Sequence, residues 1–142
     1  MKRTPLRRKS KTPLAKLKEK LWSLCREIQI LRCGSVCYTC GRSNLEGGNR
    51  QLGHFIASSL CSVEMRYEIE GNLKIQCYMC NINHSGNTLQ FRRNLIRDHG
   101  IEYVEELEER NQATKGHMYR EDWYQAKISE YQDILRQLQE GN

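Results

Sequence analysis

Two short stretches of the sequence, 37-CYTC-40 and 77-CYMC-80, decide the fold. Each separates two cysteines by two residues, a spacing at which one tight turn directs both sulfurs at the same metal ion. Together they predict a structural Zn²⁺ held by Cys37, Cys40, Cys77 and Cys80. The 36 residues between the two pairs exceed the spacing of a compact zinc ribbon. We therefore expect a further structural element between the pairs, fixed in place by the metal.

Other uses of these cysteines stay open from the sequence alone. The two pairs could form two disulfides, or they could be unrelated thiols. Seven cysteines in a chain without a secretion signal favour a reducing compartment, where paired cysteines bind metal more often than they form disulfides. Cys33 competes with Cys37 as the first ligand, although the two-residue spacing favours Cys37. Cys25 and Cys61 are expected to be small buried apolar residues.

The residues around the second cysteine pair predict a hairpin followed by a helix. Residues 50–56 and 73–77 are expected to form two short strands, joined by a loop of about 16 residues. Residues 87–99 are expected to form a helix that ends at Gly100. Its inward-facing apolar residues are expected to be Leu89, Leu95 and Ile96.

Two amphipathic helices flank this region, with a short acidic helix at 101–110 between the hairpin and the second of them. The first is expected to begin at Pro13, with Thr12 as its N-cap, and to end near Gly34. Its apolar residues alternate at spacings of three and four: Leu14, Leu17, Leu21, Leu24, Ile28 and Leu31. The last helix, 120–139, has the same spacing in Tyr124, Ile128, Tyr131, Leu135 and Leu138. The two stripes are expected to pack together in one core, or across a dimer.

The sequence thus predicts an α+β, mainly helical fold with a zinc-clamped core at 35–100, flanked by N- and C-terminal helices. Residues 14–142 are expected to form a single domain and residues 1–13 a basic flexible arm. A chain of 142 residues buries roughly two thirds of its unfolded surface, enough for one modest core. No apolar run approaches the ~20 residues of a transmembrane helix, and no apolar stretch follows the basic N-terminus. We therefore expect a cytoplasmic protein without a membrane partner.

Positive charge is concentrated at the N-terminus. The first 20 residues carry nine Lys and Arg and one acid, whereas the remainder carries 14 basic and 16 acidic residues, so the net +6 comes from the first segment. A basic arm on a nearly neutral body favours nucleic acid as the partner, although a solvated tail without a partner stays an alternative. The basic residues expected to contact DNA are Arg3, Arg7, Arg8, Lys9 and Lys11 in the arm and Arg66, Arg92 and Arg93 in the body.

A second group of polar residues predicts phosphodiester chemistry. His54, on the first strand, could act as a general base in its neutral form. Asn81 opens a helical segment, and its amide oxygen could hold Mg²⁺ weakly while leaving positions for phosphate and water. Asn72, or a backbone carbonyl of the second strand, would fix the tautomer of His54. The alternatives are a half-buried structural histidine, a helix-capping asparagine and, for His84, a solvent-facing residue.

Several motifs follow one another in a recognisable order. They are the Thr-Pro-Leu repeats of the arm, the first Cys-x2-Cys, Gly53-His54-Phe55-Ile56, Met65-Arg66-Tyr67, Gly71-Asn72-Leu73, Cys77-x2-Cys80-Asn81 and Ser85-Gly86-Asn87. In this combination the chain resembles the NinG (Rap) recombination proteins of lambdoid phages. The motif order also resembles the HNH, or ββα-metal, nucleases, especially the phage resolvase endonuclease VII, where four cysteines hold a zinc. The resemblance implies a zinc-stabilised ββα-metal fold and Mg²⁺-dependent cleavage of branched DNA in the host cytoplasm.

The resemblance also assigns roles by position. His54 matches the catalytic histidine, Asn72 the middle asparagine of the HNH pattern, and Asn81 the metal-binding position that opens the helix. His84 falls where resolvase-like members carry a second, acidic metal-site residue. Many HNH enzymes have Asp immediately before the catalytic histidine, and here that position is Gly53. The catalytic Mg²⁺ would then depend on Asn81, with either His84 or Asn87 as a further ligand, and on a DNA phosphate.

Different functions fit these features. The first is a structure-specific endonuclease acting on D-loops and four-way junctions, whose two-fold symmetry would match a homodimer. The second is a non-catalytic zinc module that binds branched or single-stranded DNA and recruits recombination proteins. The missing acid in the metal-binding group favours this second function. A third is a partner-binding protein that uses the acidic helix at 102–109.

Overall fold

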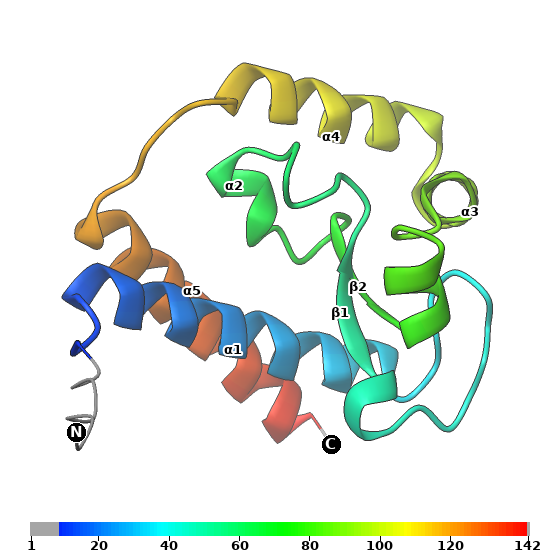
Figure 1. The fold of residues 1–142 in the computed structure, drawn as a ribbon, viewed down its shortest axis with the longest axis horizontal. Coiled ribbons are helices and arrows are strands. Elements are labelled where there is room, and N and C mark those ends of the chain that lie inside the picture. The colour runs from blue at the N-terminus through cyan, green and yellow to red at the C-terminus, as the bar shows by residue number, and fades with distance from the viewer. Residues whose placement is uncertain (1–8, 142) are drawn as a thin grey trace, which may run out of the picture.

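The computed structural model describes residues 9–141. In this part of the chain, helices surround a sheet of two short strands (Figure 1). The elements follow in the order α1 (Pro13–Cys33), the 3-10 turn η1 (Gly47–Asn49), β1 (Gln51–His54), α2 (Val63–Arg66), β2 (Leu73–Gln76), the π-helical turn η2 (Met79–Asn83), α3 (Thr88–His99), α4 (Ile101–Thr114) and α5 (Glu121–Glu140). The predicted mainly helical α+β fold is confirmed at this level.

The two strands form the predicted hairpin, with a longer excursion between them. β1 and β2 pair antiparallel, and Leu52 faces Ile75 while His54 faces Leu73 in the register. Both strands are shorter than predicted, and the connection between them contains a one-turn helix, α2, that the sequence analysis placed in a loop. The side chain of Ser62 caps α2 by accepting from the backbone N–H of Met65.

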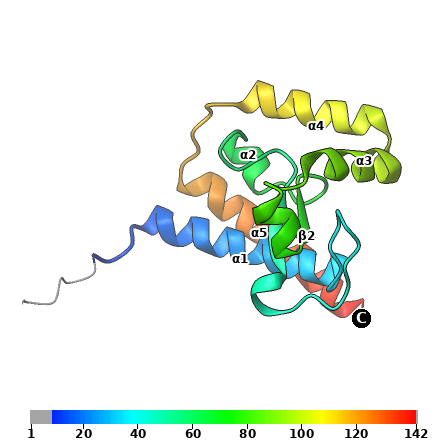
Figure 2. The same ribbon diagram turned by 45° about the vertical axis from the view of Figure 1, so that its right-hand side comes forward.

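The first and last helices lie side by side and run in the same direction (Figures 1 and 2). α1 begins as predicted, because the Thr12 hydroxyl accepts from the backbone N–H of Ala15. The buried residues of the α1 stripe include Leu21 and Ile28, and those of the α5 stripe are Tyr124, Ile128 and Tyr131. The prediction for Leu31 was wrong: its side chain is 40% exposed. It lies in the last turn of α1, beyond the most closely packed part of the pair.

A second apolar cluster lies between α2, α3 and α4. It contains Phe55, Met65, Phe91, Leu95, Val104 and Leu107. The prediction that Leu89 faces inward was wrong, since it is 77% exposed and Phe91 takes the buried position. The acidic helix α4 extends to Thr114, four residues beyond its predicted end, and covers α2 and α3 (Figure 1).

Among the described residues, none of the helices combines the length and the apolar character that crossing a membrane requires.

Candidate metal centre and active site

The four predicted cysteines come together at one end of the hairpin. The Sγ atoms of Cys37, Cys40, Cys77 and Cys80 all lie within 4.8 Å of one another. The Sγ atoms of Cys40 and Cys77 lie 3.7 Å apart. Cys33, the rival ligand, is not part of this group. Four thiols at this separation match the donor set and geometry of a structural zinc site, so the cluster could hold a Zn²⁺.

Hydrogen bonds prepare the cluster for a cation. Burial raises the pKa of the Cys37 thiol, but hydrogen bonds from Thr39 and neighbouring backbone amides outweigh it and lower that pKa to about 6. The side-chain amide of Asn87 donates to Cys80 Sγ at 3.5 Å. Asn87 was considered as a helix cap or as a further ligand of the catalytic metal. It occupies the N-cap position of α3, but its side chain makes no capping bond there. It therefore connects the start of α3 to the thiols.

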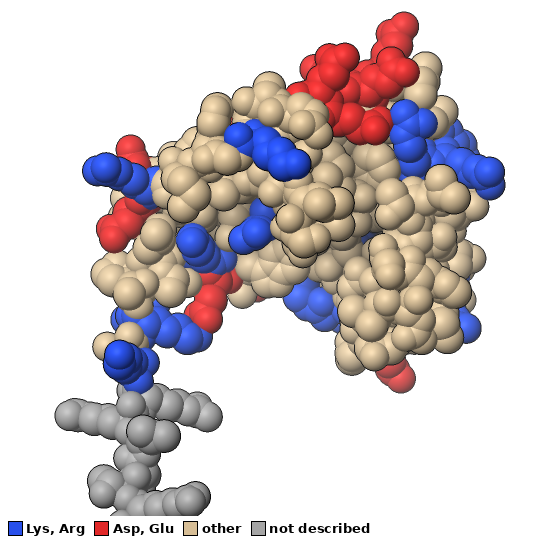
Figure 3. Space-filling view, turned by 45° about the horizontal axis from the view of Figure 1, so that its top comes forward, with Lys and Arg blue, Asp and Glu red and all other residues tan. Residues whose placement is uncertain are grey.

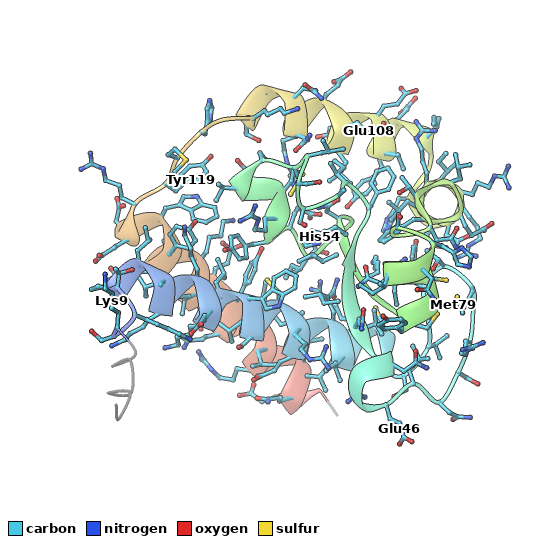
Figure 4. All side chains as sticks on the ribbon, viewed as in Figure 1. Lys9, Glu46, His54, Met79, Glu108 and Tyr119 are labelled. Atoms are coloured by element: carbon cyan, nitrogen blue, oxygen red, sulfur yellow. The ribbon has the colours of Figure 1, made fainter. Side chains whose placement is uncertain are left out.

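His54 ends β1 and lies between the hairpin, α2 and α1 (Figure 4). Its Nε2 lies 3.1 Å from the backbone carbonyl of Arg66. On one side its ring stacks on Trp22 of α1, with 5.4 Å between ring centres and 16° between planes. Burial lowers the pKa of His54 below 6.5, and the Arg66 guanidinium adds to this, while the hydrogen bond to the Arg66 carbonyl acts in the opposite direction. The neutral imidazole is therefore the favoured form, with its orientation fixed.

His54 and Asn81 line the same surface hollow, which has a volume of about 460 Å³. The residues around this hollow are Trp22, Leu52, His54, Ala57, Ser58, Asn81, Ile82, Ser85 and Gly86. None of them is acidic. The hollow is thus lined by a histidine, an asparagine and two serines on a partly apolar wall.

Asn81 sits in the π-helical turn η2, where the N–H of His84 bonds to the carbonyl of Met79, five residues earlier. Such turns recur at functional sites because they shift side chains out of regular helical register. The Asn81 side-chain amide donates to Gln51 Oε1 at 2.8 Å. This bond fixes the orientation of the amide and leaves Asn81 Oδ1 as an acceptor. The predicted second ligand, His84, is exposed and is not among the residues of the hollow.

The side chains packed around Gly53 leave no space for a Cβ atom at this position. A Cβ atom at this position would lie 1.8 Å from Gln76 Oε1 and 3.1 Å from Asn81 Oδ1. The fully buried Gln76 side chain donates to the Gly86 carbonyl at 2.9 Å and to Thr39 Oγ1 at 3.1 Å. It thereby links the first cysteine turn to the wall of the hollow. Without a side chain at Gly53, the Gln76 amide fits against the strand.

Asn72 does not contact the His54 ring, and the partner of that ring is not on the second strand. The buried Asn72 accepts from the N–H of Ile56 and donates to the carbonyl of Met65, both at 2.7 Å. These two segments directly follow His54 and directly precede Arg66. The prediction that Asn72 or a carbonyl of β2 fixes the His54 tautomer was therefore wrong. Asn72 acts one step further away, by holding the two segments that position the ring and its acceptor.

Sequence reasoning missed several residues that build this site. Glu68 is buried and accepts backbone N–H bonds from Glu70, Gly71 and Asn72, which shapes the turn before β2. Trp22 was treated only as part of a helix, although it is the aromatic wall of the hollow. No local pattern indicates such contacts, because they join residues that are far apart in the sequence.

The predicted DNA-contacting residues differ in their surroundings. Arg3, Arg7 and Arg8 lie outside the described residues. Lys9 and Arg93 are exposed, and Lys11 pairs with Glu19. Arg66 is exposed and donates to the carbonyl of Ser58 at the edge of the hollow. Arg92 pairs with Glu108 at 2.9 Å, so α4 already compensates its charge. Figure 3 shows the largest group of acidic side chains at the upper edge, with basic ones beside it, and smaller acidic groups elsewhere on this face.

Comparison with known proteins places these features in a family. A family model described as bacteriophage lambda NinG protein matches residues 3–141. Over 105 residues the chain is 31% identical to protein ninG of Salmonella phage P22, which covers 74% of this chain and 48% of that protein. Over 102 residues it is 30% identical to protein ninG of Escherichia phage lambda, covering 72% and 47%. The chain thus spans about half the length of these curated relatives. No solved structure matches it.

Proposed function

This chain belongs to the family of the bacteriophage lambda NinG protein, and we propose that it is a metal-dependent endonuclease that cleaves branched DNA. The substrates would be recombination intermediates such as D-loops and four-way junctions, in the cytoplasm of a phage host. Its core would be a ββα-metal unit made of β1, β2 and the segment from η2 into α3. The chain spans about half the length of these relatives. The proposal is therefore argued from the residues of this chain, above all from those of the hollow.

The observation that carries the proposal is the oriented, neutral imidazole of His54 in the same hollow as Asn81. A general base must be unprotonated near neutral pH and must point at the water that it activates. Burial and the nearby Arg66 guanidinium favour the neutral ring. The Trp22 stack helps to orient the ring, and the Arg66 carbonyl accepts from Nε2. Nδ1 then carries the free lone pair and accepts the proton.

In the proposed reaction, His54 takes a proton from a water molecule in the hollow, and the water oxygen attacks the scissile phosphorus in line with the leaving 3′-oxygen. Asn81 lines the hollow, and its Oδ1 would hold the divalent cation. When bound, Mg²⁺ supplies charge neutralisation at the phosphate and the leaving oxygen. The cysteine cluster keeps η2 and the hairpin in fixed relative positions through Gln76 and Asn87.

DNA binding would use the basic residues outside the hollow. Arg66, at its rim, and the exposed Arg93 would contact phosphates, and the basic arm would add salt-dependent affinity. Because four-way junctions are two-fold symmetric, a homodimer would present two such hollows to one junction.

The test compares nicking of four-way junctions, D-loops and linear duplexes by zinc-loaded protein with and without Mg²⁺. We expect Mg²⁺-dependent nicking of the branched substrates and a loss of at least ~100-fold in His54→Gln. His117→Gln is the matched control, because His117 is exposed and lies outside the hollow. Equal nicking by His54→Gln and the control, or no nicking of any substrate, would remove the proposal.

A specific observation favours a second function. No acidic residue lines the hollow, so the strongest ligands for Mg²⁺ are missing there. A non-catalytic zinc module that binds branched or single-stranded DNA and recruits recombination proteins would need none. That module would bind junctions equally well as wild type and as His54→Gln, and it would nick none of them.

A further inference from the structure

The position before His54 holds an unusual arrangement of oxygen atoms. If Gly53 had a side chain, its Cβ would clash with Gln76 Oε1, only 1.8 Å away. The Gln76 amide oxygen therefore occupies the space that a side chain of residue 53 would otherwise enter. Gln76 itself comes from β2, in the position that pairs with Gln51 of β1. An oxygen from the second strand thus reaches the place that the first strand leaves free.

The orientation of the Gln76 amide is fixed by its nitrogen. Nε2 donates to the Gly86 carbonyl, which can only accept, and also lies 3.1 Å from Thr39 Oγ1. The nitrogen and oxygen therefore cannot exchange places without breaking a bond. Gln76 Oε1 is buried and has no hydrogen-bond partner among the described residues. A buried acceptor without a partner costs about 1–3 kcal/mol, which calls for a water or an ion as its partner.

A second amide oxygen lies beside the first. Asn81 Oδ1 is 3.1 Å from the same point next to Gly53, and Asn81 Nδ2 is held by Gln51 Oε1. Both amides are thus oriented by their nitrogens, and both oxygens lie within 3.1 Å of the point where a Cβ of residue 53 would stand. Asn81 also lines the hollow that contains His54, so this place adjoins open solvent. Two converging neutral oxygens are ligands that a hard divalent cation accepts.

We propose that Gln76 Oε1 and Asn81 Oδ1 are the protein ligands of a divalent-cation site. Gln76, on β2, provides the oxygen ligand that Gly53, on β1, lacks a side chain to provide. This inference rests on the proposed function and names a ligand for its cation. Two neutral amides hold Mg²⁺ or Mn²⁺ more weakly than carboxylates do. The site would therefore fill mainly when a DNA phosphate adds its negative oxygens.

The chain contains a matched control in Gln29. Like Gln76, this residue is fully buried, and its Oε1 has no partner among the described residues. Its Nε2 also has two acceptors, in this case the backbone carbonyls of Ile69 and Leu73. Gln29 lies on α1 and is not among the residues of the hollow. A carboxylate placed at either position therefore carries a comparable burial cost, and only one of the two lies beside Asn81.

The experiment measures Mn²⁺ binding to the zinc-loaded full chain without DNA, by electron paramagnetic resonance of free Mn²⁺. Gln76→Glu should tighten Mn²⁺ binding at least about tenfold, because it adds a charge to the ligand set. Gln29→Glu should leave the affinity unchanged. Zinc content and a melting curve verify that both variants are folded. Equal affinities of Gln76→Glu and wild type would overturn the inference.

A second measurement needs no variant. In wild-type protein, substoichiometric Mn²⁺ should broaden the side-chain amide signals of Gln76 and Asn81 in a ¹H–¹⁵N spectrum well before those of Gln29. Loss of the Gln29 signal first would overturn the inference even if Gln76→Glu did not fold. Mn²⁺ binding through Gln76 in a chain that nicks no DNA would remove the proposed function alone. Nicking by a chain whose Gln76 signals stay sharp would remove this inference alone.

Discussion

The α1–α5 pair and the hairpin region from Cys37 to Gly86 meet at β2, but side chains of different kinds stabilise them. In the helix pair the buried contacts are apolar and aromatic, as between Leu21, Ile28 and Tyr124. In the hairpin region, buried amides and a carboxylate join backbone segments that have no regular pairing. The four thiols could add a metal crosslink to this region.

The difference shows that one kind of interaction stabilises this small domain while another fixes the positions of the side chains in its site. Apolar packing is non-directional, so it stabilises the helix pair without fixing individual atoms. Buried hydrogen bonds are directional, and they fix the His54 ring and the Asn81 amide. Each such bond is also vulnerable, because removing one partner leaves the other buried and unsatisfied. The two regions should therefore fail in different ways.

The largest effect is expected when the cysteine cluster is broken. In Cys77→Ser, the hairpin region should unfold, because structural zinc contributes an apparent free energy of about 10–16 kcal/mol in small sites, as much as a whole domain's net stability. The α1–α5 pair should keep its helical signal, since the two helices pack directly on each other. Zinc analysis and a ¹H–¹⁵N spectrum measure this, through loss of dispersed amides from residues 37–86.

Cys33→Ser is the matched control for this variant. Cys33 is half-buried near the cluster but is not part of it, so zinc content and amide dispersion should match wild type. A dispersed spectrum for Cys77→Ser, or zinc loss in Cys33→Ser, would show that the metal does not separate the two regions in this way.

The next largest effect is expected in the helix pair. Leu21 is fully buried, and Leu21→Ala should lower the free energy of unfolding by about 3 kcal/mol through lost burial and the cavity left behind. Zinc content should stay at one per chain. Leu31→Ala, at a 40% exposed position of the same helix, should change stability by less than about 0.5 kcal/mol. Urea unfolding measures both, and equal costs would refute the assignment of the packed face.

A smaller loss of stability is expected from Asn72→Ala, with a larger effect on the site. The change leaves the Ile56 N–H and the Met65 carbonyl without a partner, which should cost about 2 kcal/mol. The same change frees the segments on both sides of His54 and Arg66, so nicking should fall further than stability does. Asn83→Ala, at an exposed position, is the control for both readouts. A variant with unchanged nicking and reduced stability would assign Asn72 to the fold alone.

The sequence allowed the helix pair and the cysteine cluster to be predicted for clear physical reasons. Helical periodicity depends on residues that are close in the sequence. It therefore predicted α1 with its Thr12 cap and α5 with Tyr124 on the buried face. The Cys-x2-Cys spacing reflects the geometry of a single turn, so the cluster was predictable too. Errors such as Leu31 and Leu89 arose where the periodicity continues but the packing partner does not.

The inner contacts of the hollow could not be predicted in the same way. The partner of His54 is a backbone carbonyl, at Arg66, and any residue type provides one. Trp22 reaches His54 across 32 sequence positions, and Gln76 reaches Gly86 across a turn of irregular geometry. Gly53 looked like a missing acid, whereas the structure shows a glycine that the Gln76 side chain requires. Such contacts depend on tertiary geometry that no local spacing encodes.

The smallest expected effect tests whether the polar region really holds His54 neutral. Burial lowers the pKa of this imidazole below the 6.5 of an exposed histidine, so the unfolded chain binds the proton more readily than the folded one. The stability that neutral His54 contributes is therefore complete above pH 6.5 and is lost as the pH falls below that value. His54→Gln removes this dependence while keeping a donor for the Arg66 carbonyl. Between pH 7.5 and 5.5, wild type should lose more stability in urea unfolding than His54→Gln does, and parallel losses would show that the ring is not held in its neutral form.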